Sequence, residues 1–399
     1  MAIVVNSFPT LSETFIFNKV KGLTKAGLDV TVFTGSRQND MNAFSDRMDG
    51  ISSGQIRFSF MADGVAGVII GILNSLFTHP VGSVRLLFAS IRTYPKLRRS
   101  LKAFLLALPL KLGHYDIIHF EFSGLAVTYL DALPLLKPCK LLTSCRGAAE
   151  QIIPLVDLTR GDRLRQVFAS MDRVHCVSHH MQKTVEKYGL KPGQAFVNHP
   201  AIDLEKFHRE TPYPGKSSGP YRLISVGRLH WKKGLEFGLI AVRRLLDERY
   251  DVEYEIIGGG PELEKIIFLI HDMGLTGKVQ LIGRQDAIKV RYALENADIC
   301  LLPSLSEGLS NAVLEAMAME IPVVSTTAGG MEEAIADGQE GFLVPPYRPD
   351  LMAEKVILLI KNSMLRVRIG QEGRKRVEKD FKMDSQIKKF INEYKQLIN

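Results

Sequence analysis

The sequence predicts an α/β protein with two doubly wound domains, and three observations carry that prediction. The 399 residues exceed the size that one hydrophobic core usually fills. Short apolar stretches typical of strands alternate with helical stretches in both halves, which favours parallel sheets covered by helices. Proline, glycine and serine accumulate between residues 198 and 220, as expected for a linker between domains.

The first domain is expected to cover residues 1–205. It opens with a strand, a helix and a second strand, and the alternation resumes after residues 40–112, which show no clear period. The predicted strands are 2–5, 30–33, 117–120, 140–143 and 173–177, and the predicted helices are 13–26 and 163–170.

The linker is placed at 206–220 and the second domain at 221–378. Six predicted strands alternate there with five helices, as in a doubly wound sheet whose ligands bind at the carboxyl ends of the strands. The strands are 221–226, 254–257, 279–282, 299–302, 322–325 and 341–344, and the helices are 235–248, 262–273, 287–296, 311–319 and 331–336.

Three more helices are predicted at 351–362, 364–379 and 383–397. No strand follows the last of them, which is amphipathic. We therefore expect the final segment, 379–399, to cross back and pack on the first domain.

The composition is that of an ordinary soluble α/β protein, with 46% hydrophobic and 24% charged residues and no repeat or low-complexity tract. A net charge of +8 fits an anionic partner, such as a phosphorylated substrate or an acidic lipid surface. Nucleic acid is not expected, because no stacking motif or basic helix accompanies the charge. Four scattered cysteines and the absence of a recognisable secretory leader favour a cytoplasmic location.

An uncharged stretch departs from this picture. Residues 64–84 carry no Asp, Glu, Lys or Arg, and basic residues are frequent from there to residue 102. Polar residues and Pro80 interrupt the apolar run, which disfavours a membrane-spanning helix. Two interpretations stay open: a buried or domain-packing helix pair, and an amphipathic region that rests on an anionic membrane surface through residues 64–102.

Two glutamates give the best clue to function. Glu307 follows an apolar strand, and Glu315 lies about one turn inside the helix that Ser310 or Asn311 can cap, so both carboxylates are expected at one crevice. One can accept hydrogen bonds from sugar hydroxyls and the other from a ribose diol. The alternative is a solvated loop glutamate and a solvated helix glutamate. Free backbone N–H groups are expected to face a phosphate at Gly308, Leu309, Ser310 and Asn311.

Two cations and several glycines lie at other strand ends of the same domain. Arg228 follows the first strand and Lys233 begins the next helix, where both can neutralise a pyrophosphate; ordinary surface cations are the alternative. Glycine turns are expected to let backbone approach a ligand closely. The turn residues singled out are Gly227, Gly259, Gly260, Gly283 and its neighbour Arg284.

Together these motifs make the second half resemble the donor-binding domain of the retaining glycosyltransferases of family 4. The matching segments are 226–229, 233–234, 257–261, 306–316, 322–324, 328–330 and 337–344. The resemblance implies the GT-B fold, in which two Rossmann-like domains face a deep cleft. It also implies that Glu307 contacts the donor sugar, that Glu315 contacts the ribose, and that Arg228 and Lys233 contact the diphosphate.

The first domain resembles the family's acceptor-binding domain, and residues 8–16 are similar to the opening of bacterial enzymes that build exopolysaccharide. It departs from the family in one place, where Arg146 stands for the usual histidine. Arg146 can still bind a donor phosphate. His119 is the other candidate, as a catalytic or as a core histidine. Glu121 and Glu150 are candidate acceptor contacts.

The resulting prediction is a metal-independent retaining glycosyltransferase that needs no cofactor. It takes a nucleotide-diphosphate sugar as donor and a lipid-linked or growing surface glycan as acceptor. It is expected in the cytoplasm, with the inner face of the cytoplasmic membrane as the alternative. Two other functions stay open: a nucleotide-sugar epimerase of the same fold, and a non-catalytic nucleotide-sugar-binding subunit.

Overall fold

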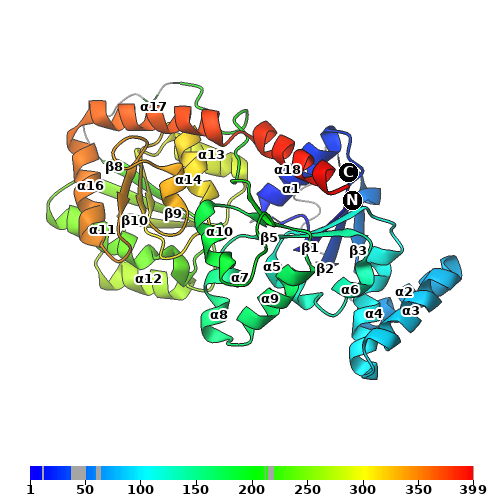
Figure 1. The fold of residues 1–399 in the computed structure, drawn as a ribbon. Coiled ribbons are helices and arrows are strands. Elements are labelled where there is room, and N and C mark those ends of the chain that lie inside the picture. Colours follow the sequence, from blue (N-terminus) through cyan, green and yellow to red (C-terminus); the bar gives the residue numbers. More distant parts are fainter. Residues whose placement is uncertain (11–12, 37–50, 60–63, 212, 214–219, 399) are drawn as a thin grey trace. The chain divides into compact units, whose positions relative to one another are not determined.

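The computed structural model describes all residues of the chain except 11–12, 37–50, 60–63, 212, 214–219 and 399 (Figure 1). The chain forms two compact units, each of which is a parallel β-sheet covered by helices. The first unit comprises Met1–Val177, Met181–Asn198 and Ile387–Asn399, and the second comprises Ser178–His180 and His199–Gln386.

The first unit contains a seven-stranded parallel sheet in the order β3-β2-β1-β4-β5-β6-β7. Its strands are β1 (Ala2–Ser7), β2 (Thr31–Ser36), β3 (Ile56–Phe58), β4 (Ile117–Phe120), β5 (Lys140–Cys145), β6 (Arg173–Cys176) and β7 (Ala195–Val197). Its helices are α1 (Thr14–Lys25), α2 (Gly64–Thr78), α3 (Pro80–Thr93), α4 (Leu97–Lys111), α5 (Ser123–Thr128), α6 (Leu133–Leu136), α7 (Ala148–Gln151), α8 (Ile153–Val156), α9 (Arg160–Ser170) and α10 (His179–Glu186). The first two residues of α10, His179 and His180, are grouped with the second unit. All four residues of β4 are buried, as expected for a central strand covered on both faces.

The part of the first unit that showed no clear period contains β3 and the three helices α2, α3 and α4. Helix α4 packs Ala103, Phe104 and Ala107 into the core. Helices α2 and α3 instead project from the unit (Figure 1) and leave large apolar side chains in solvent, with Phe77 89% exposed and Phe88 68% exposed. Among the described residues of the first unit, no element covers the outer faces of α2 and α3, so the interpretation of 64–84 as a pair buried within that unit is wrong.

Among the described residues, no single helix is long and apolar enough to cross a membrane. The segments Ala66–Thr78 and Pro80–Thr93 meet the criteria of length and composition only as a pair, and the pair is bent by 119°.

The second unit contains a six-stranded parallel sheet in the order β10-β9-β8-β11-β12-β13, which confirms the predicted doubly wound sheet. Its strands are β8 (Tyr221–Val226), β9 (Val252–Ile257), β10 (Val279–Gly283), β11 (Ile299–Leu302), β12 (Val323–Thr326) and β13 (Phe342–Val344). Its helices are α11 (Leu235–Asp247), α12 (Leu263–Asp272), α13 (Ala287–Glu295), α14 (Asn311–Ala318), α15 (Met331–Ala334), α16 (Pro349–Lys361) and α17 (Ser363–Asp380). The predicted bounds agree with these to within a few residues.

The expected linker, 206–220, lies partly outside the described residues. The part that is described packs on the second unit, because Phe207 and Tyr213 are buried there. The Tyr213 hydroxyl donates a hydrogen bond to Asp298 at 2.7 Å and accepts one from Arg366 at 3.0 Å. The chain passes from the first unit to the second between Asn198 and His199.

The last helix, α18 (Met383–Ile398), crosses back to the first unit, as predicted. Phe390 and Tyr394 are buried in that unit. The Lys19 ammonium lies 4.0 Å from the centre of the Phe390 ring, and the Tyr394 hydroxyl lies 2.8 Å from the His119 ring nitrogen Nδ1. Apolar and polar contacts therefore both anchor the C-terminal helix.

Candidate active site

A small pocket lies at the carboxyl ends of β8 and β11 in the second unit. Its wall includes Gly227, Arg228 and Lys233, together with residues at the ends of both strands. Arg228 is exposed, and its guanidinium has no hydrogen-bond or ion-pair partner in the described part of the chain. The structure thus brings the two predicted phosphate-binding cations to one pocket.

The loop that carries Lys233 is joined to the loop after β11 by backbone contacts. The Lys232 carbonyl accepts a hydrogen bond from the Leu305 N–H at 2.7 Å. Gly234 has a φ of +57°, and a Cβ there would lie 2.2 Å from the Pro303 carbonyl oxygen. Any other residue would push the two loops apart, so glycine holds Lys233 over the end of β11.

Lys233 and Glu307 form an ion pair inside this site. The Lys233 Nζ lies 2.5 Å from the Glu307 Oε1, and the side chains are only 16% and 10% exposed. The Ser304 hydroxyl donates a second hydrogen bond to the same oxygen at 2.8 Å. The cation assigned to the diphosphate and the carboxylate assigned to the donor sugar are therefore already in contact.

Glu315 lies on α14 and is partly buried. In the regions that the structure describes, its carboxyl group has no hydrogen-bond partner. Burial raises the pKa of Glu315 to about 7, against the opposing charge of Lys206. A carboxyl group that has lost water without gaining a protein partner is available to a ligand hydroxyl.

We expect nucleotide affinity to weaken as the pH falls below about 7, because a ribose diol hydrogen-bonds better to the ionised Glu315 carboxylate than to its protonated form. Each pH unit below that point should cost up to ~10-fold in affinity. Calorimetric titration of the nucleoside diphosphate between about pH 5.5 and 8.5 tests this.

The Glu315→Gln variant should bind more weakly and lose this pH dependence. The phosphates of the nucleotide titrate in both proteins, so the difference between the two profiles isolates Glu315. Glu354→Gln, on the exposed face of α16, is the control and should keep the parent profile. Identical profiles for the parent and Glu315→Gln would contradict the assignment.

The start of α14 has open backbone donors. Ser310 is the residue before the first helical turn, but its side chain makes no capping hydrogen bond, so the predicted side-chain cap is wrong. The side-chain oxygen of Asn311 is buried without a partner among the described residues. An uncapped first turn and an orphaned amide oxygen leave this end of the helix ready for an anionic, hydroxyl-bearing ligand.

Two of the predicted glycine turns lie against other parts of the protein, and their approach to a ligand stays a prediction. A Cβ on Gly260 would lie 2.2 Å from the Leu229 carbonyl oxygen, and one on Gly259 would lie 2.9 Å from the exposed Arg284 side chain. These glycines therefore let neighbouring loops of the protein approach one another. A Cβ on Gly283 would have no close neighbour, but the φ of this glycine is +75°.

The loop that carries Glu307 also contacts the loop after β12. The Gly330 N–H donates a hydrogen bond to the Gly308 carbonyl at 2.9 Å. A Cβ on Gly329 would lie 1.9 Å from the Glu307 carbonyl oxygen. Leu309 is buried in the core of the second unit. The backbone around Glu307 is therefore held by packing on one side and by the loop after β12 on the other.

In the first unit, His119 is a core residue, and its assignment as a catalytic group is wrong. It is fully buried, with the Tyr394 hydroxyl 2.8 Å from Nδ1 and the Ser144 hydroxyl 2.9 Å from Nε2. Burial and the nearby Lys19 ammonium hold the pKa of His119 well below its usual range, so the ring is neutral. Both ring nitrogens are occupied within the core, which leaves none for a substrate.

Arg146 belongs to a buried charge cluster. Its guanidinium bonds the Glu121 carboxylate at 2.6 Å and the Glu121 carbonyl at 3.1 Å, and it lies 4.3 Å from the centre of the Phe15 ring. Glu121 is fully buried and also pairs with Lys19, which is 2% exposed. Arg146 itself is 16% exposed, so one edge of it still reaches the surface of the first unit.

Glu121 and Glu150 do not fit their predicted role as acceptor contacts. Glu121 is occupied by two cations. Glu150 is buried, accepts hydrogen bonds from the Ser123 hydroxyl and from the Gly147 N–H at 3.0 Å, and therefore holds the start of α7. Burial raises the pKa of Glu150. Both carboxyl groups serve the fold of the first unit.

Comparison with known families assigns both halves of the chain. Residues 12–206 match the family described as Glycosyltransferase Family 4, and residues 208–376 match the family described as Glycosyl transferases group 1. The chain belongs to the family-4 glycosyltransferases.

Two relatives connect this family-4 glycosyltransferase to bacterial surface polysaccharides. It is 28% identical to the amylovoran biosynthesis glycosyltransferase AmsK of Erwinia amylovora over 94% of each chain. It is 30% identical to the putative colanic acid biosynthesis glycosyltransferase WcaL of Salmonella typhimurium. That second match spans only 60% of the relative's length.

Solved structures show that this glycosyltransferase has the GT-B fold of two Rossmann-like domains. HepE of Anabaena, in complex with UDP and glucose, superimposes with a TM-score of 0.75 at 14% identity over 99% of both chains. TarM superimposes with a TM-score of 0.75 at 13% identity over 100% of this chain and 98% of its own. At such low identity the likeness concerns the fold.

The sequence interpretation missed Ser304 and the unpaired state of the Asn311 amide. Ser304 lies three residues before Glu307 in the same strand-end loop, and that position could have marked it. The partners of Glu121 could not have been found in this way, because Lys19 lies about a hundred residues away in the sequence.

Proposed function

We propose that the protein is a retaining glycosyltransferase that moves a sugar from a nucleotide-diphosphate sugar to a hydroxyl of a lipid-linked or growing surface glycan. The strand-end pocket of the second unit carries the proposal, because two cations and a carboxylate converge on it. The relatives in amylovoran and colanic acid biosynthesis support the choice of a surface glycan as the acceptor.

Departure of the nucleoside diphosphate is the difficult step, since negative charge grows on the diphosphate as positive charge grows on the sugar. Arg228 offers a forked pair of donors and Lys233 a point charge, and the open N–H groups at the start of α14 add a third positive region. When Lys233 moves to bind the phosphate, its ion pair with Glu307 weakens. The Glu307 carboxylate can then accept hydrogen bonds from the sugar.

The proposed transfer occurs on one face of the sugar. The bond between the anomeric carbon and the diphosphate oxygen breaks, the acceptor oxygen bonds the anomeric carbon, and the acceptor proton passes to the departing phosphate. Because two cations and a helix start already neutralise the leaving group, the transfer is proposed to need no metal ion or cofactor.

A screen of UDP-, GDP- and ADP-sugars by thermal stabilisation tests the proposed donor site. A donor bound by the folded state alone must raise the melting temperature. Turnover with the selected donor should persist after EDTA treatment, and NMR should show a product with the donor's anomeric configuration. A product with inverted anomeric configuration overturns the proposed retention. Formation of an epimer from the donor without any acceptor shows that the protein is an epimerase. Donor binding without any turnover identifies a non-catalytic subunit.

The acceptor side points to a membrane surface. Large apolar side chains of α2 and α3 repeat at helical spacing on their exposed sides, with Leu73 61%, Phe77 89% and Phe88 68% exposed. Contiguous apolar surface of this kind marks an interaction site. The whole exposed set is Ile69, Ile70, Leu73, Leu76, Phe77, Val81, Val84, Phe88, Ile91, Leu97 and Leu101, here called the α2–α4 apolar face.

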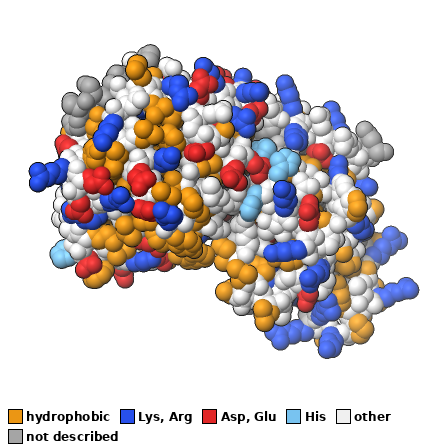
Figure 2. Space-filling view, turned by 60° about the vertical axis from the view of Figure 1, so that its left-hand side comes forward, with side chains coloured by type: hydrophobic (Ala, Val, Ile, Leu, Met, Phe, Trp, Pro, Cys, Tyr) orange, Lys and Arg blue, Asp and Glu red, His pale blue; other side chains and the backbone are white. Residues whose placement is uncertain are grey.

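Basic side chains in the same segment as the α2–α4 apolar face support an anionic bilayer as the proposed partner. They are Arg85, Arg92, Lys96, Arg98, Arg99 and Lys102. The lower right of Figure 2 shows Lys and Arg side chains that project beside apolar ones. Apolar rings that enter the headgroup region and cations that meet lipid phosphates are the two components of interfacial binding. We therefore place the enzyme at the cytoplasmic membrane face, where a lipid-linked acceptor is available.

We expect the protein to float with vesicles that contain phosphatidylglycerol and not with pure phosphatidylcholine vesicles, and to be released by salt. Phe77→Ser combined with Phe88→Ser should reduce flotation at least ~10-fold, because two exposed rings leave the interface. Leu158→Ser removes an equally exposed side chain outside the face and should float like the parent. Equal flotation of all three proteins would contradict the proposed surface.

A further inference from the structure

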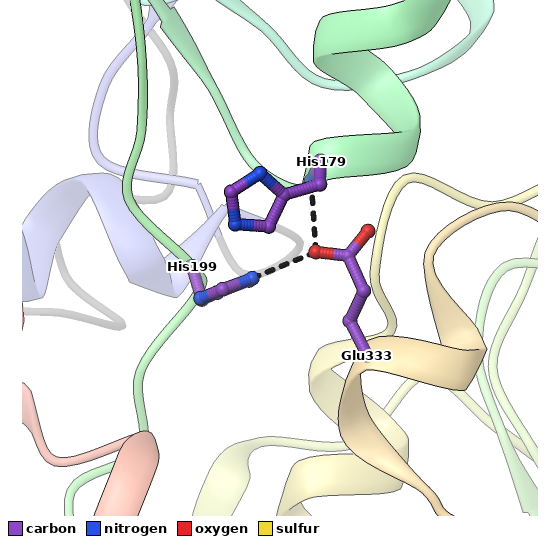
Figure 3. A group of neighbouring side chains, drawn as sticks. All are labelled: His179, His199 and Glu333. Carbon is purple, nitrogen blue, oxygen red and sulfur yellow. Dashed lines mark hydrogen bonds and ion pairs between the residues drawn. The ribbon is translucent and has the colours of Figure 1, made fainter.

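Three potential metal ligands gather in the second unit, apart from the residues assigned to the sugar nucleotide. His179 is the first residue of α10, His199 follows β7, and Glu333 lies on α15 (Figure 3). One ligand atom from each lies within 4.8 Å of the others. The sequence interpretation used none of these residues.

The Glu333 carboxylate is held in one orientation. Its Oε2 accepts hydrogen bonds from the His179 N–H at 2.8 Å and from the His199 Nε2 at 2.9 Å, and its Oε1 accepts one from the His180 N–H at 2.8 Å. Burial acts to raise the pKa of Glu333, but these donors outweigh it and lower the pKa below its usual range. The group is an oriented anion.

The side chains of His179 and His199 both lie beside this carboxylate (Figure 3). Their centres are 5.9 Å apart with an angle of 66° between the rings. His199 is 28% exposed, and its ring lies 5.7 Å from the Phe381 ring, which holds its plane. The His179 side chain is exposed. His199 and Glu333 are partly exposed as well, so an ion can enter from solvent.

We propose that His179, His199 and Glu333 bind a divalent transition-metal ion, with zinc as the best fit. Zinc accepts imidazole nitrogen and carboxylate oxygen at about 2.0–2.2 Å, so its ligand atoms lie about 3.4 Å apart. The three ligand atoms now lie within 4.8 Å of one another, so they would have to move closer together on binding the ion. Two nitrogen ligands disfavour magnesium and calcium, which prefer oxygen. Three protein ligands leave one position for water or an anion.

The ion would join segments that are distant in the sequence. Residues 178–180 and His199 belong to the second unit, whereas residues 177, 181 and 198 belong to the first. Glu333 is three residues from Gly330, whose N–H bonds the Gly308 carbonyl next to the proposed donor site. A bound ion therefore restrains the chain where it enters the second unit, and it takes no part in the proposed transfer step.

Metal binding by the full chain tests the proposal after chelator treatment and dialysis. Equilibrium dialysis against zinc, with metal analysis, should find one ion per chain. Cobalt should give the visible absorption of a tetrahedral site. His179→Gln and His199→Gln should each weaken zinc binding at least ~10-fold, because each removes one of three ligands. His271→Gln, an exposed histidine on α12, should bind zinc like the parent.

His179→Gln is the decisive variant, because only the main-chain N–H of that residue holds Glu333 and the fold should be unaffected. Its melting temperature without metal should equal that of the parent, whereas zinc should stabilise the parent more than the variant. The absence of stoichiometric zinc binding, or equal affinity in the parent and His179→Gln, overturns the proposal. None of these measurements uses sugar transfer, so the outcome is independent of the proposed function.

Discussion

Replacing Lys233 by alanine is expected to lower kcat/KM for sugar transfer by roughly 10²–10³-fold. Two effects act together in this variant. The diphosphate loses a cation that lines its pocket, and the Glu307 carboxylate, only 10% exposed, keeps Ser304 as its remaining bonded partner. An uncompensated carboxylate next to a diphosphate repels the donor in the ground state and opposes charge growth on the leaving group.

A second variant separates the effect of the positive charge at residue 233 from the effect of where that charge lies. Lys233→Arg should recover part of the activity, because arginine also binds phosphate but with a longer and planar head group. Lys289→Ala, on the exposed surface of α13, is the control and should leave kcat/KM unchanged. The double variant Lys233→Ala with Glu307→Gln should lose less than the sum of the single losses, since the two residues share one ion pair. Strict additivity, or a loss below about threefold in Lys233→Ala, would contradict the assigned role.

Replacing Glu121 by glutamine is expected to lower the free energy of unfolding of the first unit by about 3–5 kcal/mol. Lys19 and Glu121 are 2% and 0% exposed, so the variant leaves a cation inside the protein without its counter-charge. Arg146 loses its carboxylate partner as well. Urea unfolding followed by fluorescence and circular dichroism measures the loss.

An exposed ion pair provides the matched control. Asp162 and Arg165 are 71% and 56% exposed, and Asp162→Asn should change the stability by less than about 1 kcal/mol. Burial alone would raise the pKa of Glu121, but Lys19 and its neighbours lower it well below the ordinary value of 4.5. The stabilisation from ionised Glu121 is therefore complete above about pH 4.5 and is lost as the pH falls below it. Equal losses in Glu121→Gln and Asp162→Asn would rule out a buried cluster.

The fold of the second unit could be predicted closely because its signals are local. Its strands are short, largely apolar runs between predicted helices, and parallel strands place their carboxyl ends at one edge. Arg228, Lys233 and Glu307 were selected because they lie at these strand ends and within segments that resemble the family, and their roles stay predictions. The predicted side-chain cap of α14 is wrong, because Ser310 begins the helix without a capping hydrogen bond. The glycines at 259 and 260 lie against other parts of the protein, and their approach to a ligand stays a prediction.

Much of the first unit could not be predicted. The run at 64–84 is apolar enough for either a core or a surface, and only the absence of a covering element within the unit shows that α2 and α3 are exposed. His119 was a catalytic candidate because of its residue type and its place at a strand end. In the structure its Nδ1 contacts the hydroxyl of Tyr394 on α18, which comes from the other end of the chain.

The sequence by itself determined the order of strands and helices in the second unit, its doubly wound sheet, and the strand ends at which a sugar nucleotide is expected. These follow from hydrophobic period and from spacing, which are properties of neighbouring residues, and the motifs at those strand ends indicated the family by resemblance. The tertiary structure decided which charged groups are partners and which remain available to a ligand. Glu121 forms ion pairs with Lys19 and Arg146, whereas Glu315 has no hydrogen-bond partner among the described residues. Electrostatic pairing and desolvation depend on distances between atoms that are far apart in the chain, and only folding sets those distances.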